Sequence, residues 1–101
     1  MRATTNTEQN QAAGIIPWRV LKVNALPVFQ LSVQFIDGTE GIVDMAAFLR
    51  RDCGIFESLR DAGMFSTAHI ENGAVTWENG LDLAPDRMYD ELQNAEVYVV
   101  R

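Results

Sequence analysis

The chain has almost none of the residues from which covalent crosslinks and metal sites are built. Its 101 residues include a single cysteine, Cys53, and a single histidine, His69. One cysteine forms no disulfide within the chain, and one thiol with one imidazole falls short of the ligand set of a zinc site. We therefore expect a structural thiol at Cys53, no metal ligands, and a fold held together by packing alone.

Long apolar segments are absent as well. No run approaches the roughly 18 consecutive apolar residues of a membrane-spanning helix, and the first residues, Met1 to Thr5, lack the apolar stretch of a secretory signal peptide. We expect a cytoplasmic protein that has no membrane partner. Hydrophobic residues still make up 48% of the chain, which suits a folded protein better than a disordered one.

Positive charge is scarce, above all in the second half. The formal net charge is −6, and residues 37–101 carry thirteen acidic side chains against five arginines. Nucleic-acid binding gains most of its affinity from neutralised phosphates, so we do not expect this chain to bind nucleic acid directly. The alternative is a domain that binds nucleic acid, and the basic residues that support it are Arg2, Arg19 and Lys22. An acidic surface suits a basic protein partner better.

Catalytic and cofactor signatures are also lacking. The sequence has no glycine-rich phosphate loop, no His-Glu-x-x-His helix and no Gly-x-Ser-x-Gly elbow. His69, with Thr76 and Glu71 as predicted neighbours, loosely imitates a catalytic triad, but a solvent-facing strand residue is the simpler interpretation. We therefore expect no catalytic residue, no cofactor and no enzymatic activity. A small-molecule-binding domain is the alternative.

Polar residues dominate the beginning of the chain. Residues 1–14 are rich in Thr, Asn, Gln and Ala, and we expect them to form a flexible N-terminal arm. Residues 15–101 are enough for one domain with one core. We expect a single α+β domain there, with no internal repeat.

The first predicted hairpin contains the clearest strand of the chain. Apolar and polar side chains alternate over residues 29–35, which gives this strand one apolar face. A strand over 18–26 precedes it, and Asp37-Gly38 supplies the turn to a partner strand over about 40–44. A two-residue loop would put carboxylates on the apolar face, so we predict a three-residue loop that pairs Phe35 with Gly41.

Shorter elements follow. A helix to Arg51 and a second one with Ile55 facing inward and Gly63 at its end are predicted. A second hairpin pairs 68–71 with 74–77, and a helix begins at Pro85. We expect residues 97–101 to form an edge strand or a free tail, and an edge strand there could build a homodimer or accept a partner strand. The expected fold is α+β, with antiparallel hairpins forming a small sheet and two or three short helices packed on it.

Acidic residues gather in the last third of the chain. Six of them fall between Glu78 and Glu96, with only Arg87 opposing them. Their spacing predicts a solvated face, because a catalytic carboxylate pair needs burial and a calcium loop needs a different pattern. Aromatic residues nearby could anchor a partner. The candidate interaction surface comprises Trp77, Asn79, Asp82, Asp86, Tyr89 and Asp90.

One motif runs through most of the chain: Leu31-x-Val33-x-Phe35-x-Asp37-Gly38, Val43-Asp44, Phe56-x-x-Leu59, Phe65, and Trp77-x-Asn79-Gly80-x-Asp82-Leu83-x-Pro85-x-x-Met88-Tyr89. This motif resembles the domain of unknown function 2442 family of small bacterial proteins. The resemblance implies an α+β domain without assigned activity, often encoded beside another small domain in pairs that look like toxin–antitoxin pairs. We therefore expect an interaction domain, antitoxin-like, that binds a small basic protein. A transcription-regulator domain is the alternative that longer relatives suggest.

Overall fold

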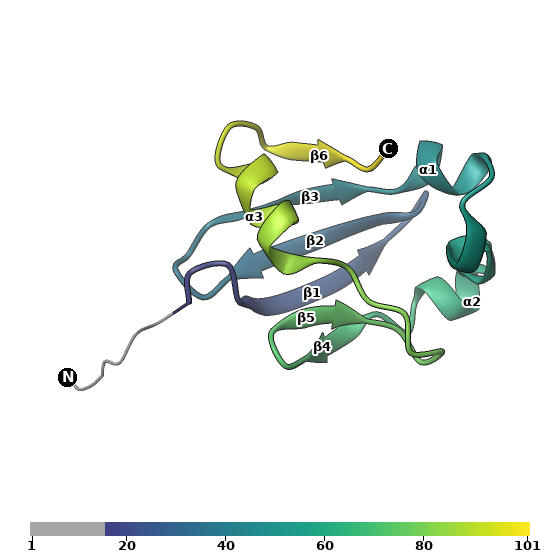
Figure 1. The fold of residues 1–101 in the computed structure, drawn as a ribbon, viewed down its shortest axis with the longest axis horizontal. Helices are drawn as coiled ribbons and strands as arrows, with labels where there is room; N and C mark the ends of the chain where they lie inside the picture. The colour runs from purple at the N-terminus through teal and green to yellow at the C-terminus, as the bar shows by residue number, and fades with distance from the viewer. Residues whose placement is uncertain (1–15) are drawn as a thin grey trace.

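A four-stranded sheet in the order β1-β2-β3-β6 forms the centre of the computed structural model (Figure 1). The model describes residues 16–101, so the predicted flexible arm over residues 1–14 lies outside the described residues. Strands β1 (Val20–Leu26), β2 (Gln30–Phe35) and β3 (Glu40–Asp44) are antiparallel, and β6 (Val97–Val99) runs parallel to β3.

A second sheet of two strands, β4 (His69–Glu71) and β5 (Ala74–Thr76), lies beside β1. The helices are all short: α1 (Ala46–Arg50), the 3-10 helix η1 (Gly54–Arg60), α2 (Ala62–Phe65) and α3 (Pro85–Leu92). This arrangement confirms the predicted α+β fold. No helix among the described residues is both long and apolar enough to span a membrane.

The hairpin between β2 and β3 has the predicted loop length in a different register. The Phe35 N–H donates to the Thr39 carbonyl at 2.7 Å, so the loop consists of residues 36–38. Val33 pairs with Gly41, and the predicted pairing of Phe35 with Gly41 was wrong by two positions. The φ of Gly38 is 96°, which glycine adopts without strain and which sets the turn one residue earlier than expected. Because side chains alternate between the two faces of a sheet, a register shift of two residues keeps every side chain on its predicted face.

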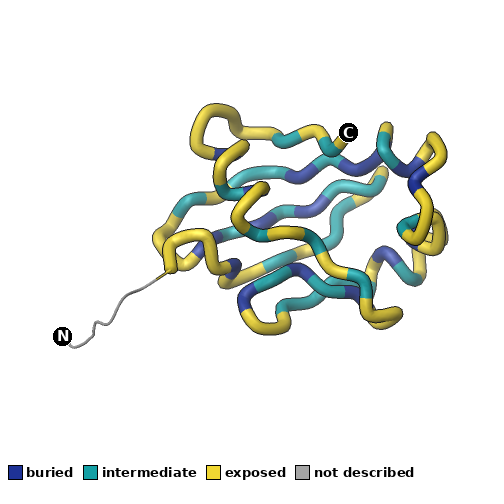
Figure 2. The backbone as a smooth tube through the Cα atoms, in the orientation of Figure 1, coloured by how far each residue is buried: buried dark blue, intermediate teal, exposed yellow. Residues whose placement is uncertain are grey.

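The core lies on one face of the four-stranded sheet, under α3 and the helices at one end (Figures 1 and 2). Gly41 allows α3 to pack closely, because a Cβ at this position would lie 2.6 Å from Cδ2 of Leu92. In β2, buried side chains alternate with half-buried ones, as the sequence pattern predicts. The core joins side chains of the sheet to side chains of the helices and of the loop after β5, and its members include Leu31, Val33, Phe35, Val43, Leu59, Phe65, Trp77, Met88 and Leu92.

The second predicted helix is two separate elements. Residues 54–60 form η1, and α2 begins after Asp61, whose side chain accepts a hydrogen bond from the Met64 N–H at 3.1 Å. This cap starts a new helix, so Gly63 lies inside α2 and the prediction that it ends a helix was wrong. Ile55 is 75% exposed, which also contradicts its predicted inward orientation.

The turn between β1 and β2 holds two residues in the left-handed region. Val28 has a φ of 60° and Phe29 a φ of 55°. A β-branched side chain rarely adopts this conformation, and Val28 is 69% exposed, so packing offers it little in return. The turn therefore stores backbone strain.

Replacing Val28 by glycine should relieve that strain. We expect Val28→Gly to raise the free energy of unfolding by about 0.5–1 kcal/mol, because the relief exceeds the entropy that glycine loses on folding. Urea denaturation followed by circular dichroism measures the change. Ile55→Gly, at an exposed position within η1, is the matched control and should destabilise the protein. A destabilised Val28→Gly variant would contradict the assignment of strain.

Candidate functional site

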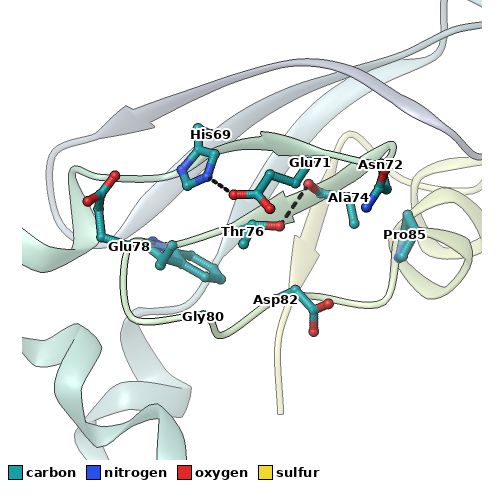
Figure 3. Close-up of a pocket in the computed structure, with 10 residues that line it drawn as sticks. His69, Glu71, Asn72, Ala74, Thr76, Glu78, Gly80, Asp82 and Pro85 are labelled. Carbon is teal, nitrogen blue, oxygen red and sulfur yellow. Dashed lines mark hydrogen bonds and ion pairs between the residues drawn. The ribbon is translucent and has the colours of Figure 1, made fainter.

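An open cleft of about 540 Å³ lies between the β4–β5 hairpin and the loop that leads to α3 (Figure 3). Among the described residues, four titratable side chains line it, and none of the lining residues is a lysine or an arginine. We call it the acidic cleft and define it by these four residues: His69, Glu71, Glu78 and Asp82.

The hairpin of β4 and β5 forms one wall of the cleft. His69 pairs with Thr76 and Ile70 pairs with Val75, which confirms the predicted register of this hairpin. The turn at Asn72 and Gly73 has φ values of 52° and 77°, as expected for a two-residue hairpin loop. Because side chains alternate along a strand, His69 shares its face with Glu71 and both line the cleft.

A tight turn after β5 forms the other wall. The Trp77 N–H donates to the Leu81 carbonyl at 2.9 Å, and the Gly80 N–H donates back to the Trp77 carbonyl at 2.9 Å. The side-chain oxygen of Asn79 accepts from the Leu81 N–H at 3.2 Å. This turn reverses the chain, so that Asp82 pairs with Thr76 and its carboxylate lines the cleft.

His69 has an acceptor at each ring nitrogen. Nδ1 lies 2.8 Å from the Thr67 carbonyl oxygen, and Nε2 lies 2.7 Å from a carboxylate oxygen of Glu71. Only the protonated imidazole has two N–H donors for two acceptors. The Thr67 carbonyl, and next the Glu71 carboxylate, therefore raise the pKa of His69 above its ordinary value of 6.5.

The raised pKa of His69 can be measured directly. In an NMR titration of the imidazole we expect a pKa above 6.5 in the wild type and a lower one in Glu71→Gln. A raised pKa means that proton binding favours the folded state. The stability that this proton contributes is fully present below the pKa of His69 in the unfolded chain. It is lost as the pH rises through the pKa of His69 in the folded protein. A wild-type pKa at or below 6.5 would contradict the two contacts.

The triad-like grouping of the sequence is not assembled in the structure. The Thr76 hydroxyl donates to the Ala74 carbonyl at 3.2 Å, and His69 directs its nitrogens to Thr67 and Glu71. No base therefore contacts the hydroxyl. Within residues 16–101, no three histidine, cysteine, aspartate or glutamate side chains cluster in a way that could hold a metal ion.

Two aromatic members of the predicted interaction surface are engaged inside the protein. Trp77 is 1% exposed, and its indole N–H donates to the Phe65 carbonyl at 3.0 Å, so the expectation that it anchors a partner was wrong. Tyr89 is half-buried and its ring packs edge-on against Phe35, with centroids 5.2 Å apart. The Tyr89 hydroxyl donates to Asp37 at 2.6 Å.

The contact between Tyr89 and Asp37 joins α3 to the β2–β3 loop. The donated hydrogen bond lowers the pKa of Asp37, and the Thr39 N–H lowers it further. The same carboxylate raises the pKa of the Tyr89 hydroxyl. We infer that this pair positions α3 on the sheet, which leaves little of Tyr89 for a partner.

The polar members of the predicted surface do not form one site. Asp82 lines the cleft, whereas Asp86 lies in the first turn of α3 and Asp90 one turn later, both exposed. Asn79 donates from its amide to the Ser58 hydroxyl at 2.7 Å and so supports the turn. Sequence reasoning missed Glu71 and Glu78 as neighbours of Asp82, although the β4–β5 pairing already placed Glu71 on the His69 face.

A family model described as "Protein of unknown function (DUF2442)" matches residues 20–94. The matched segment begins with the first residue of β1, ends shortly after α3, and contains all four residues of the acidic cleft. Searches of the curated proteins and of the solved structures found no match.

Proposed function

The chain belongs to the DUF2442 family of proteins of unknown function, and we propose that it acts in the cytoplasm as a non-enzymatic interaction domain. In this proposal the acidic cleft receives a basic segment of a partner protein. The partner is a small basic protein, and the domain acts toward it as an antitoxin-like inhibitor that covers a positively charged surface.

One observation carries this proposal: the carboxylates of Glu71, Glu78 and Asp82 line the same open cleft, and none of the lining residues within 16–101 is a lysine or an arginine. Among these lining residues, His69 is the side chain that can oppose the carboxylates when it is protonated, and it is already paired with Glu71. Lysine or arginine side chains from outside could neutralise these carboxylates while all the charges stay partly hydrated. Such contacts favour fast association and discrimination between partners.

The size and openness of the cleft fit a protein segment. Its volume of about 540 Å³ exceeds what one charged side chain fills, and the hairpin and the turn leave it open to solvent. Trp77 is among the lining residues, and because it is 1% exposed and its indole N–H is bound to the Phe65 carbonyl, the core holds this part of the wall in place. Rigid walls reduce the ordering that a binding partner would otherwise cost.

No contact among the described residues favours the nucleic-acid alternative. The side chain of Arg19 lies against the backbone of Gly73, and Lys22 is exposed on β1. A phosphate backbone needs several such cations in a row. The net charge of −6 further opposes that role.

Co-expression with the product of the adjacent reading frame tests the proposal. We expect the two proteins to co-purify at low salt and to separate as the ionic strength rises, because contacts between exposed charges are screened. A charge-reversed Asp82→Lys chain should lose the partner. Absence of a complex at micromolar concentrations of both proteins would argue strongly against an antitoxin-like role.

A further inference from the structure

The two edges of the four-stranded sheet differ in how they are covered. At the β1 edge the Val20 N–H donates to the Gly73 carbonyl at 2.8 Å, and a bulge interrupts the strand between Val20 and Lys22. At the other edge β6 pairs with β3, and no strand among residues 16–101 lies beyond it. Natural sheets protect such edges with short strands, prolines, bulges or inward charges. Strand β6 is short, at three residues, but it contains no proline, bulge or charge.

The backbone groups of Val97 and Val99 point away from β3. The Ile42 N–H donates to the Glu96 carbonyl at 3.0 Å, and the Val100 N–H donates to the Asp44 carbonyl at 3.0 Å. Even-numbered residues of this segment therefore face β3, and alternation directs the N–H and C=O of Val97 and Val99 outward. Their side chains are also exposed, at 45% and 40%. These groups can pair with one more strand.

Charges along this edge are ordered from acidic to basic. Glu96 stands before β6 and Arg101 after it. A groove of about 450 Å³ beside the edge is lined by Arg87 and Glu91 of α3 together with β6 residues and Arg101. An antiparallel strand identical to β6 would bring its Arg101 toward this Glu96, and its Glu96 toward this Arg101. A parallel copy would instead bring like charges together.

We propose that a second copy of this chain pairs its β6 antiparallel with this β6, around a twofold axis at Tyr98. Val97 then lies opposite the Val99 of the other copy, so the outward backbone groups of both strands are satisfied and the two sheets become one. A three-residue pairing with a charged rim is smaller than a standard interface. We therefore expect a weak dimer, with a Kd on the order of 10–100 μM.

Analytical ultracentrifugation over protein concentrations of about 1 μM to 1 mM tests this dimer. The wild type should shift from monomer to dimer mass across this range. Val99→Pro removes an outward N–H without removing a bond to β3, so this variant should keep its circular dichroism spectrum and remain a monomer. Val99→Thr, which retains the N–H, is the matched control and should dimerise like the wild type.

A charge exchange tests the antiparallel direction. Glu96→Arg and Arg101→Glu, each alone, should weaken the dimer severalfold, and the double variant should restore it. A wild type that stays monomeric at about 1 mM overturns the proposal, as does a Val99→Pro variant that dimerises normally. Failure of the double variant to recover overturns the twofold pairing.

Discussion

The variant Trp77→Ala is expected to lose about 3–5 kcal/mol of unfolding free energy, a large part of the stability of a domain of this size. The Trp77 ring is buried beside Phe65, with centroids 6.1 Å apart, and its N–H is bound to the Phe65 carbonyl. Alanine would leave a cavity and would remove one of the two hydrogen bonds that the Phe65 carbonyl accepts, the other coming from the Ala68 N–H. Urea denaturation followed by far-ultraviolet circular dichroism measures the loss.

Trp18→Ala is the control for this experiment. Trp18 is exposed at the entry to β1, so its removal should change the unfolding free energy by less than about 1 kcal/mol. If Trp77→Ala cost as little as Trp18→Ala, the tryptophan would not be a core residue. Such a result would support the sequence-based prediction that Trp77 is exposed and anchors a partner.

Neutralising the acidic cleft should weaken binding of the basic partner about threefold to a hundredfold at low salt. Each exposed charge contact contributes roughly 0.2–1 kcal/mol, and Glu71→Gln, Glu78→Gln and Asp82→Asn together remove three of them. Isothermal titration calorimetry against the co-purified partner, or against a lysine- and arginine-rich peptide, measures the change.

A second triple variant distinguishes the effect of the cleft carboxylates from the effect of the protein's net charge. Glu40→Gln, Asp52→Asn and Glu57→Gln alter the total charge by the same amount at exposed positions outside the cleft. We expect this control to retain most of the affinity. Equal losses in both triple variants would mean that the partner senses only the overall negative charge of the protein.

Local patterns predicted those elements that depend on neighbouring residues. The alternation in β2, the Asn72-Gly73 loop and the proline at the start of α3 each act within a few residues, and all three appear in the structure. The parallel pairing of β6 with β3 joins segments about 55 residues apart, and no short-range pattern encodes it. At Asp61, an N-terminal cap starts a new helix inside a segment that the sequence pattern predicted to be a single helix.

The candidate site was partly visible in the sequence. Asp82 and Asn79 were identified as candidate residues, but Trp77 was assigned to the surface. The alternation that buries Val75 also buries Trp77, two residues later on the same strand face, so the strand pattern contained the correct answer. Asp82 lies opposite Thr76 only because the chain reverses at Gly80, which fixes a three-dimensional contact that charge spacing alone does not show.

The most direct test of the proposed recognition is an NMR titration of the ¹⁵N-labelled chain with its basic partner. We expect the largest amide shifts to fall on residues 69–82, with His69, Glu71 and Asp82 among them. Shifts centred on β1 and Lys22, or none at micromolar partner concentrations, would contradict it.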